Sequence, residues 1–213
     1  MWSLCASLPF WSNRGGKLKK SVVIAGVGGQ GVITSANILS KASLKEGYKI
    51  VASELHGMAQ RGGNVECSVR IGEVFSPIIP NESADAIISF EPLEALRNLS
   101  KVRRDGIVLT DINPIVPSLI SIGIGSYPPL KEIFDKILSH CKLIKINADE
   151  IAKKAGSILT KNVVMLGAFH ALNIFPLKEK SIIDTIKETF HEKYIDLNIK
   201  AFELGKETIK NML

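Results

Sequence analysis

The amino-acid sequence predicts an α/β fold, a three-layer αβα sandwich around a mixed, mostly parallel sheet that contains an antiparallel hairpin. Short β-branched runs alternate with segments of helical periodicity, as is typical of a sheet with helices on both faces. With 213 residues, 46% of them hydrophobic, the chain can bury one sizeable core, and no linker-like stretch divides it after Lys20. We therefore expect residues 1–20 to be a disordered extension and residues 21–213 to form one domain.

The first expected unit is a strand, a glycine turn and a helix. Ser21–Ala25 is a short β-branched run between lysines and glycines, which is typical of a buried strand. The turn Gly26–Gly31 follows. Apolar residues then recur at helical spacing over Val32–Lys45, and Gly47 ends this helix. A second strand is expected at Lys49–Ser53.

The third strand is expected to run antiparallel. Only the nine residues Leu55–Gly63, three of them glycine, separate it from the second strand, and they read as a loop. A parallel third strand needs a longer, usually helical crossover, which does not fit. Apolar and polar residues alternate over Val65–Ile71, which predicts a half-exposed strand. Gly72 then allows a tight reversal, so we expect a hairpin with Val74–Ile79.

The second half of the chain continues the alternation of strands and helices. The expected strands are Ala86–Phe90, Ile107–Asp111 and Leu143–Asn147, and the expected helices are Pro92–Leu99, Leu130–Ser139 and Asp149–Ala155, with three more within Lys161–Leu213. Proline at the first position of one helix and an acidic residue at the start of another suit helix N-termini. Parallel pairing is expected for the strands at 86–90 and 107–111.

The glycine turn is the first candidate binding site. Its G-x-G-x-x-G pattern directly follows a strand and opens a helix, so the backbone can approach a ligand and the helix N-terminus can attract phosphate. The candidate ligand-contacting residues are Gly26, Gly28, Gly29, Gln30 and Gly31, with Gln30 adding an amide donor. A turn without a ligand is the simpler alternative. An NAD fold with Glu54 as ribose acceptor is disfavoured by the missing crossover.

Composition excludes several function classes. The net charge is +6, but the lysines are scattered and are not interleaved with aromatic residues, so nucleic-acid binding has little support. No apolar run approaches 18 residues, which argues against a membrane span, and Met1–Gly16 makes a poor signal peptide. Cys5, Cys67 and Cys141 are widely spaced without a CxxC pattern. This chain is therefore not expected to hold an iron–sulfur cluster or metal alone, and unpaired cysteines suit the cytoplasm.

Several stretches resemble a known family. They are GVGGQGV at residues 26–32, ELHGMAQRGGNVECSVRIG at 54–72, SPIIPNESADAIISFEPLEALR at 76–97, and NVVMLGAFHAL at 162–172. Together they resemble the small subunit of indolepyruvate ferredoxin oxidoreductases and, more broadly, the gamma domain of the 2-oxoacid:ferredoxin oxidoreductases. The resemblance runs from about Lys20 to the C-terminus. One departure is Asn81-Glu82-Ser83, where a glycine is expected before Ala84.

The resemblance implies a subunit of an enzyme that oxidatively decarboxylates a 2-oxoacid to an acyl-CoA, with coenzyme A as co-substrate and ferredoxin as electron acceptor. It implies that thiamine diphosphate and the iron–sulfur clusters lie on a larger partner subunit and that this chain has no catalytic residue and is inactive alone. The residues implied to contact substrate or partner are His56, Gln60, Arg61, Gly62 and Gly63. A gamma subunit specific for pyruvate or 2-oxoglutarate, or a free-standing nucleotide-binding module, are the alternatives.

Overall fold

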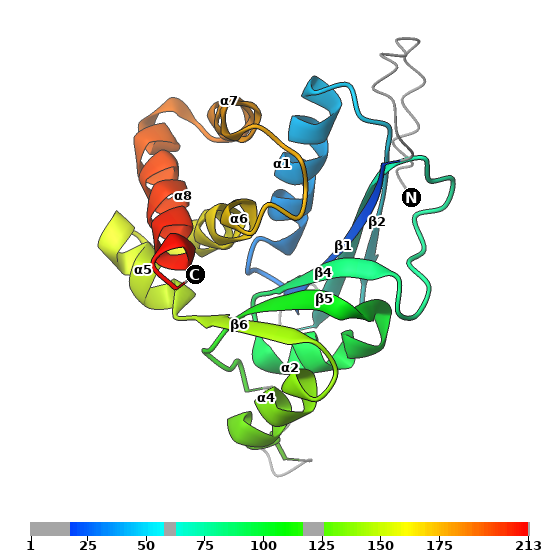
Figure 1. The fold of residues 1–213 in the computed structure, drawn as a ribbon. Coiled ribbons are helices and arrows are strands. Elements are labelled where there is room, and N and C mark those ends of the chain that lie inside the picture. Colours follow the sequence, from blue (N-terminus) through cyan, green and yellow to red (C-terminus); the bar gives the residue numbers. More distant parts are fainter. Residues whose placement is uncertain (1–17, 58–62, 117–125, 213) are drawn as a thin grey trace.

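The computed structural model describes residues 18–57, 63–116 and 126–212. Figure 1 shows a twisted sheet with helices on both sides. The strands are β1 Lys19–Val27, β2 Ile50–His56, β3 Asn64–Gly72, β4 Ala84–Ser89, β5 Val102–Asp111 and β6 Lys142–Ile146. The α-helices are α1 Val32–Lys45, α2 Pro92–Arg97, α4 Leu130–Leu138, α5 Ala148–Ala155, α6 Lys161–Ala171, α7 Glu179–Thr189 and α8 Ile195–Lys210. Short 3₁₀ turns precede β5, α6 and α8.

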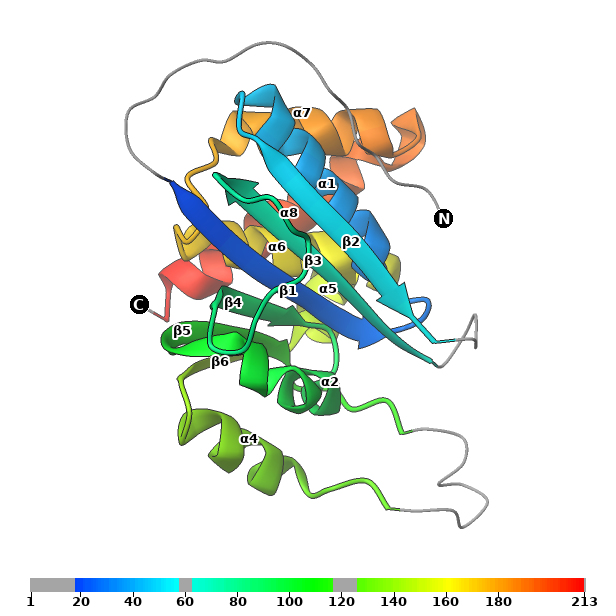
Figure 2. The ribbon, with the colours of Figure 1, turned by 90° about the vertical axis from the view of Figure 1, so that its right-hand side faces the viewer.

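The six strands form one mixed sheet in the order β2-β3-β1-β4-β5-β6. The pairs β1–β4, β4–β5 and β5–β6 are parallel, whereas β3 runs antiparallel to both of its neighbours, β1 and β2. The expected three-layer architecture and the antiparallel third strand are therefore confirmed. As a result, β1, β2, β4, β5 and β6 all point the same way, and their carboxyl ends lie together at one end of the strands (Figure 2).

Two hydrophobic cores cover the two faces of the sheet. The larger one joins the sheet to α1, α5, α6, α7 and α8, and its largest buried side chains include Phe169 and Phe202. The smaller one joins the opposite face to α2 and α4, where Ile133 and Ile137 are fully buried. The three helices expected within Lys161–Leu213 are α6, α7 and α8.

The hairpin is in a different place from the one expected. Val74–Ile79 is not a strand, and the hairpin is formed by β2 and β3. Leu55 and His56, which we expected in the loop, complete β2. The half-exposed expectation for β3 is also wrong, because Arg70 is only 5% exposed. Its guanidinium Nη1 donates to the carbonyl oxygens of Ser76 and Ile78, at 2.7 and 2.6 Å. The segment after β3 thus covers the polar face of the strand.

Two further observations concern the ends of the chain and its helices. β1 begins at Lys19, so Lys19 and Lys20 are part of the sheet rather than of the expected extension, and residues 1–17 lie outside the described residues. Among the described helices, none has an apolar stretch of the length that a bilayer crossing needs.

Glu82 lies in the Asn81-Glu82-Ser83 segment, where the family resemblance leads us to expect a glycine before Ala84, and its backbone has the left-handed φ of 53°. This conformation is unfavourable for residues with a Cβ atom and is free of strain for glycine. We expect Glu82→Gly to raise the free energy of unfolding by about 0.5 to 1 kcal/mol. Urea denaturation checks this. Asn173→Gly, at φ 52°, is the matched control and should gain less, because asparagine tolerates this region. A loss of stability in Glu82→Gly would contradict the strain argument.

Candidate functional site

The candidate site lies where the chain changes direction across the sheet. After β1 the chain passes to α1 on one face, and after β4 it passes to α2 on the other. β1 and β4 are adjacent and parallel, with Ala25 opposite Ser89. Ligands of open α/β sheets bind in the crevice outside the carboxyl ends of such a pair of strands. The glycine turn, which follows β1 directly, therefore lies at the expected binding position.

The glycines of the turn are required by its geometry. Gly29 and Gly31 have φ of 98° and 81°. A Cβ atom on Gly26 would lie 2.8 Å from Oε1 of Gln30 and 3.0 Å from Cβ of Phe90. Gly31 is the N-cap of α1, and no side chain caps this helix. The first N–H groups of α1 have no partner within the helix and carry the positive end of its dipole, so the turn can attract an anion.

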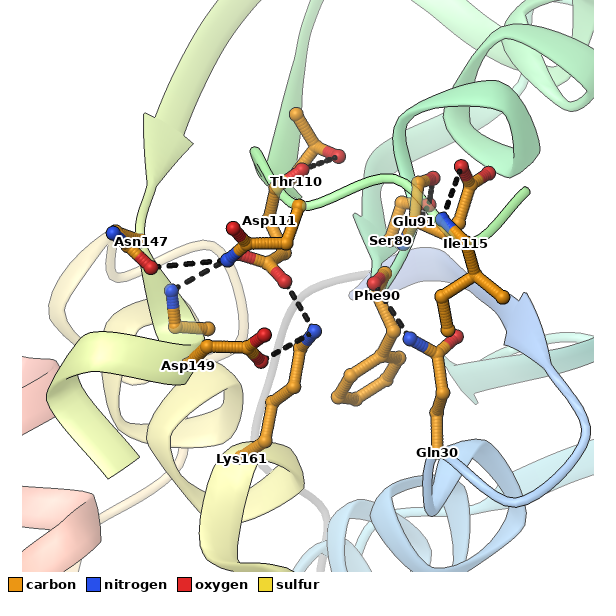
Figure 3. Close-up of polar contacts among 12 residues, drawn as sticks. Gln30, Ser89, Phe90, Glu91, Thr110, Asp111, Ile115, Asn147, Asp149 and Lys161 are labelled. Carbon is orange, nitrogen blue, oxygen red and sulfur yellow. Dashed lines mark hydrogen bonds and ion pairs between the residues drawn. The ribbon is translucent and has the colours of Figure 1, made fainter. Parts of the chain in front are cut away.

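Gln30 has a structural role that sequence analysis did not foresee. Its Oε1 accepts a hydrogen bond from the Val27 N–H at 2.7 Å. Its Nε2 donates to the carbonyl oxygen of Phe90 at 2.8 Å (Figure 3). The side chain therefore connects the ends of β1 and β4. These two hydrogen bonds hold the turn in shape, and a contact between Gln30 and a ligand stays a prediction.

The glycine turn contacts the segment 56–63, whose residues were predicted to face the substrate or the partner. The Gly28 N–H donates to the carbonyl oxygen of Gly63 at 2.9 Å. Beside this contact is an open cleft of about 730 Å³. The lining residues are Val27, Gly28, Gly29, Gly31, Val32, Ile33, Thr34, His56, Gly57 and Val65. His56 is exposed, and its Nδ1 lies 3.4 Å from the Gly57 carbonyl oxygen. Gln60, Arg61 and Gly62 lie outside the described residues.

A charged cluster at the ends of β5 and β6 was missed by sequence analysis. Asp111, fully buried, forms an ion pair with Lys161, and Nζ of Lys161 also lies 2.8 Å from Oδ1 of Asp149 (Figure 3). Oδ1 of Asp111 accepts from Asn113 Nδ2 and from the Ala148 N–H, both at 3.0 Å. The three charged residues are 38 and 12 positions apart in the chain, so no local pattern shows that they pair. A polar residue at the end of a buried strand was the one available signal.

Glu91 forms a second buried polar centre at the end of β4. Its Oε2 accepts from the Glu94 N–H at 2.9 Å and caps α2, while its Oε1 accepts from the Tyr127 hydroxyl. The same Oε1 accepts from the Ile115 N–H (Figure 3). Burial, together with the hydrogen bond to Glu91, raises the pKa of Tyr127. Burial also raises the pKa of Glu94. Ile115 and Tyr127, which lie on either side of residues 117–125, are thus both held at the carboxyl end of β4 by Glu91.

Asn162, near the start of α6, packs against the glycine turn. It is 5% exposed, and its side chain would be within 3.0 Å of a Cβ atom on Gly31. Its Oδ1 has no hydrogen-bond partner among the described residues. Like α1, α6 has no side-chain cap. The N-termini of two uncapped helices thus meet at Gly31, which adds to the positive potential there.

The described cysteines do not fit an iron–sulfur cluster. Cys67 and Cys141 belong to the two different cores, on opposite faces of the sheet. Burial raises the pKa of the Cys67 thiol to about 12 and that of Cys141 to about 11, so both stay protonated, whereas cluster ligands are thiolates. Within residues 18–57, 63–116 and 126–212, no three His, Cys, Asp or Glu side chains are grouped to hold a metal ion.

Comparison with known proteins identifies the family. The sequence model of the pyruvate ferredoxin/flavodoxin oxidoreductase family matches residues 21–208. The chain belongs to this family. The indolepyruvate oxidoreductase subunit IorB of Thermococcus kodakarensis is 44% identical over 91% of this chain and 97% of its own length. IorB of Pyrococcus horikoshii is 42% identical, with the same two coverages.

The solved structures agree in fold. A 2-oxoglutarate:ferredoxin oxidoreductase from Magnetococcus marinus, with 2-oxoglutarate, coenzyme A and succinyl-CoA bound, has a TM-score of 0.73 over 93% of this chain and 32% of its own. At 22% identity, this likeness establishes the fold alone. This chain matches only 32% of the longer Magnetococcus marinus chain, whereas it matches 97% of the Thermococcus kodakarensis IorB subunit.

Proposed function

We propose that this chain is the small subunit of an indolepyruvate ferredoxin oxidoreductase, which converts an arylpyruvate and coenzyme A to an acyl-CoA and CO₂ and transfers the electrons to ferredoxin. The identity to IorB subunits along nearly the whole of both chains supports the substrate class. The main support for the site is the hydrogen bond from the Gly28 N–H to the Gly63 carbonyl oxygen, because it joins the glycine turn to the segment HGMAQRGG, residues 56–63, beside one cleft.

The cleft of this subunit is proposed to hold coenzyme A. The first N–H groups of α1 have no partner within the helix and can bind a phosphate, and a Cβ atom on Gly29 would meet no atom of the described residues within 4 Å, which leaves space in front of the turn. Val27, Val32 and Val65 give the cleft an apolar wall suited to a non-polar part of the same molecule. Gly26, Gly28 and Gly31 shape the turn, and Gln30 braces it.

The segment from His56 to Gly63 is proposed to face the substrate or the partner subunit. His56 and Gly63 lie at the cleft. Between them, Gln60, Arg61 and Gly62 remain a prediction from the sequence. The guanidinium of Arg61 has a planar fork suited to a carboxylate or phosphate, and the adjacent glycines allow close approach. This subunit therefore positions and encloses reactants and contributes no group to covalent chemistry.

The redox chemistry is assigned to a larger partner subunit. Thiamine diphosphate supplies an electron sink for decarboxylation when bound, and iron–sulfur clusters carry electrons to ferredoxin. The buried, protonated thiols of Cys67 and Cys141 are unsuited to clusters, which supports placing these groups on the partner. The relatives' designation as subunits supports a multi-subunit enzyme.

Reconstitution tests this function. The chain expressed alone should show no oxidation of indolepyruvate and no visible absorbance from clusters. Mixing it with the large subunit should give coenzyme A-dependent reduction of ferredoxin, measured in parallel over a range of indolepyruvate, pyruvate and 2-oxoglutarate concentrations that extends below KM. We expect indolepyruvate to be preferred by at least about tenfold in kcat/KM, which corresponds to about 1.4 kcal/mol of transition-state binding.

The assay has two informative failures. A preference for pyruvate or 2-oxoglutarate would transfer the chain to another branch of the same family. Full activity of the large subunit without this chain would remove its role in the reaction. The large subunit alone and the mixture without coenzyme A are the controls.

A further inference from the structure

The two edges of the sheet are protected very differently. At one edge, β6 is five residues long, KLIKI, with lysines at Lys142 and Lys145. Short edge strands bearing lysine resist pairing with another chain. At the other edge, β2 is seven residues long, IVASELH, with Glu54 as its one formal charge, and none of its residues is buried. Its pairing with β3 is regular, without a bulge, and no second strand pairs with it among the described residues.

The phase of the hydrogen bonds shows which groups of β2 point outward. The Gly72 N–H donates to the Lys49 carbonyl oxygen, and the Gly57 N–H donates to the Asn64 carbonyl oxygen. Bonded positions alternate along an antiparallel strand, so the odd-numbered residues of β2 bond to β3. The N–H and C=O groups of Ile50, Ala52, Glu54 and His56 therefore face the open edge. They form a regular row of donors and acceptors along the whole strand.

This row is complementary to itself. When two copies of β2 run antiparallel about a twofold axis at Ser53, Ile50 lies opposite His56 and Ala52 lies opposite Glu54 of the other copy. Every outward-facing group then has a partner, and all seven residues pair. An axis at Glu54 would place two carboxylates directly opposite each other, which is destabilising. An axis at Ala52 would require pairing by Tyr48 and Lys49, which precede the strand. Ser53 is thus the favoured centre.

Exposed apolar side chains lie along the same edge. With the axis at Ser53, Val51 stands beside Leu55 of the second copy, on the same face, as a close non-hydrogen-bonded pair. Leu55 is 61% exposed in the single chain. On this face the Ser53 hydroxyl forms a hydrogen bond with the Ser68 hydroxyl, which in turn donates to the Pro77 carbonyl oxygen. The segment that contains Phe75 and Pro77 therefore lies beside β2 and β3. Phe75 is 92% exposed and lies near Lys49, whose Nζ is 5.9 Å from the ring centroid.

We propose that β2 is a self-association edge, through which two copies of this chain pair antiparallel about Ser53 to make one continuous sheet (Figure 2). The length of β2, its lack of lysine and its outward-facing backbone groups favour pairing with a further strand. The self-complementary register about Ser53, which keeps the two Glu54 carboxylates apart, favours a second copy as that strand. The inference is independent of the proposed reaction, since it uses none of the cleft residues other than the backbone of His56.

Sedimentation equilibrium of the full chain tests the pairing. Wild type should reach twice the chain mass of 23.2 kDa. Ala52→Pro removes an outward N–H that β3 does not use, a position where proline is tolerated in an edge strand. It deletes two hydrogen bonds per dimer, each worth roughly a factor of five, so the dimer Kd should rise about 25-fold. The matched control, Ala52→Thr, keeps the N–H group and should remain a dimer.

Cross-linking tests the register. At a non-hydrogen-bonded antiparallel pair the Cα atoms are about 4.5 Å apart, within disulfide range. Ser53→Cys should therefore give a disulfide-linked dimer under mild oxidation, at least about tenfold faster than Glu54→Cys or wild type with its own cysteines. A wild-type chain that stays monomeric overturns the proposal. A monomer whose Ala52→Pro variant no longer copurifies with the large subunit also overturns it, by assigning the edge to a strand of that partner.

Discussion

Replacing Lys161 by methionine should lower the free energy of unfolding by about 3 to 5 kcal/mol. The reason is that Asp111 loses the residue with which it forms an ion pair. Asp111, the last residue of β5, is fully buried, and its negative charge is neutralised by the ion pair with Lys161. Removing one member of a buried pair leaves the other charge desolvated and unpaired, which costs far more than the pair contributes. Urea denaturation of the isolated chain measures the loss.

The matched control is Lys154→Met. Lys154 pairs with Glu150 at 2.7 Å, but both side chains are more than half exposed, so this change should cost less than about 1 kcal/mol. Combining Lys161→Met with Asp111→Asn should recover part of the stability, because the buried charge is then removed together with its partner. Equal losses for Lys161→Met and Lys154→Met would show that Asp111 does not depend on this lysine.

The second large effect is expected at the crossing of α6 and α8. A Cβ atom on Gly167 would lie 2.0 Å from the Phe202 carbonyl oxygen, and one on Gly205 would lie 2.1 Å from that of Val164. Both obstacles are backbone atoms, which cannot rotate away. Gly167→Ala must therefore separate the two helices and expose part of the larger core. We expect a loss of about 3 kcal/mol or more, at the upper end of overpacking costs.

Thermal and urea denaturation measure this loss, with Ala171→Val as control on the same helix. Ala171 is partly exposed, so the added methyl groups should cost less than about 1 kcal/mol, mainly through helix propensity. At a solvent-exposed position within a helix, Gly→Ala stabilises a protein by about 1 kcal/mol. A stabilised Gly167→Ala variant would therefore mean that the helices are not in the close contact described.

The sequence determined those features that depend on neighbouring residues. The bounds of α1, Val32–Lys45, follow from local periodicity and agree with the structure. The antiparallel direction of β3 followed from the length of one connection, because nine residues cannot form a helical crossover. The position of the glycine turn between a strand and a helix was equally local. A family resemblance spread over several segments could then be recognised.

Tertiary structure decided what depends on distant residues. The Asp111–Lys161–Asp149 cluster and the burial of Arg70 arise only when separate segments are brought together by the sheet. Val74–Ile79 has the composition of a strand, but β2 takes the place beside β3, since only one strand can occupy each edge of another. The hydrogen bond from Gln30 to the Phe90 carbonyl oxygen, sixty residues away, likewise forms only in the folded chain. Local pattern fixes which elements form, whereas competition among elements for the same hydrogen bonds and core space fixes their partners.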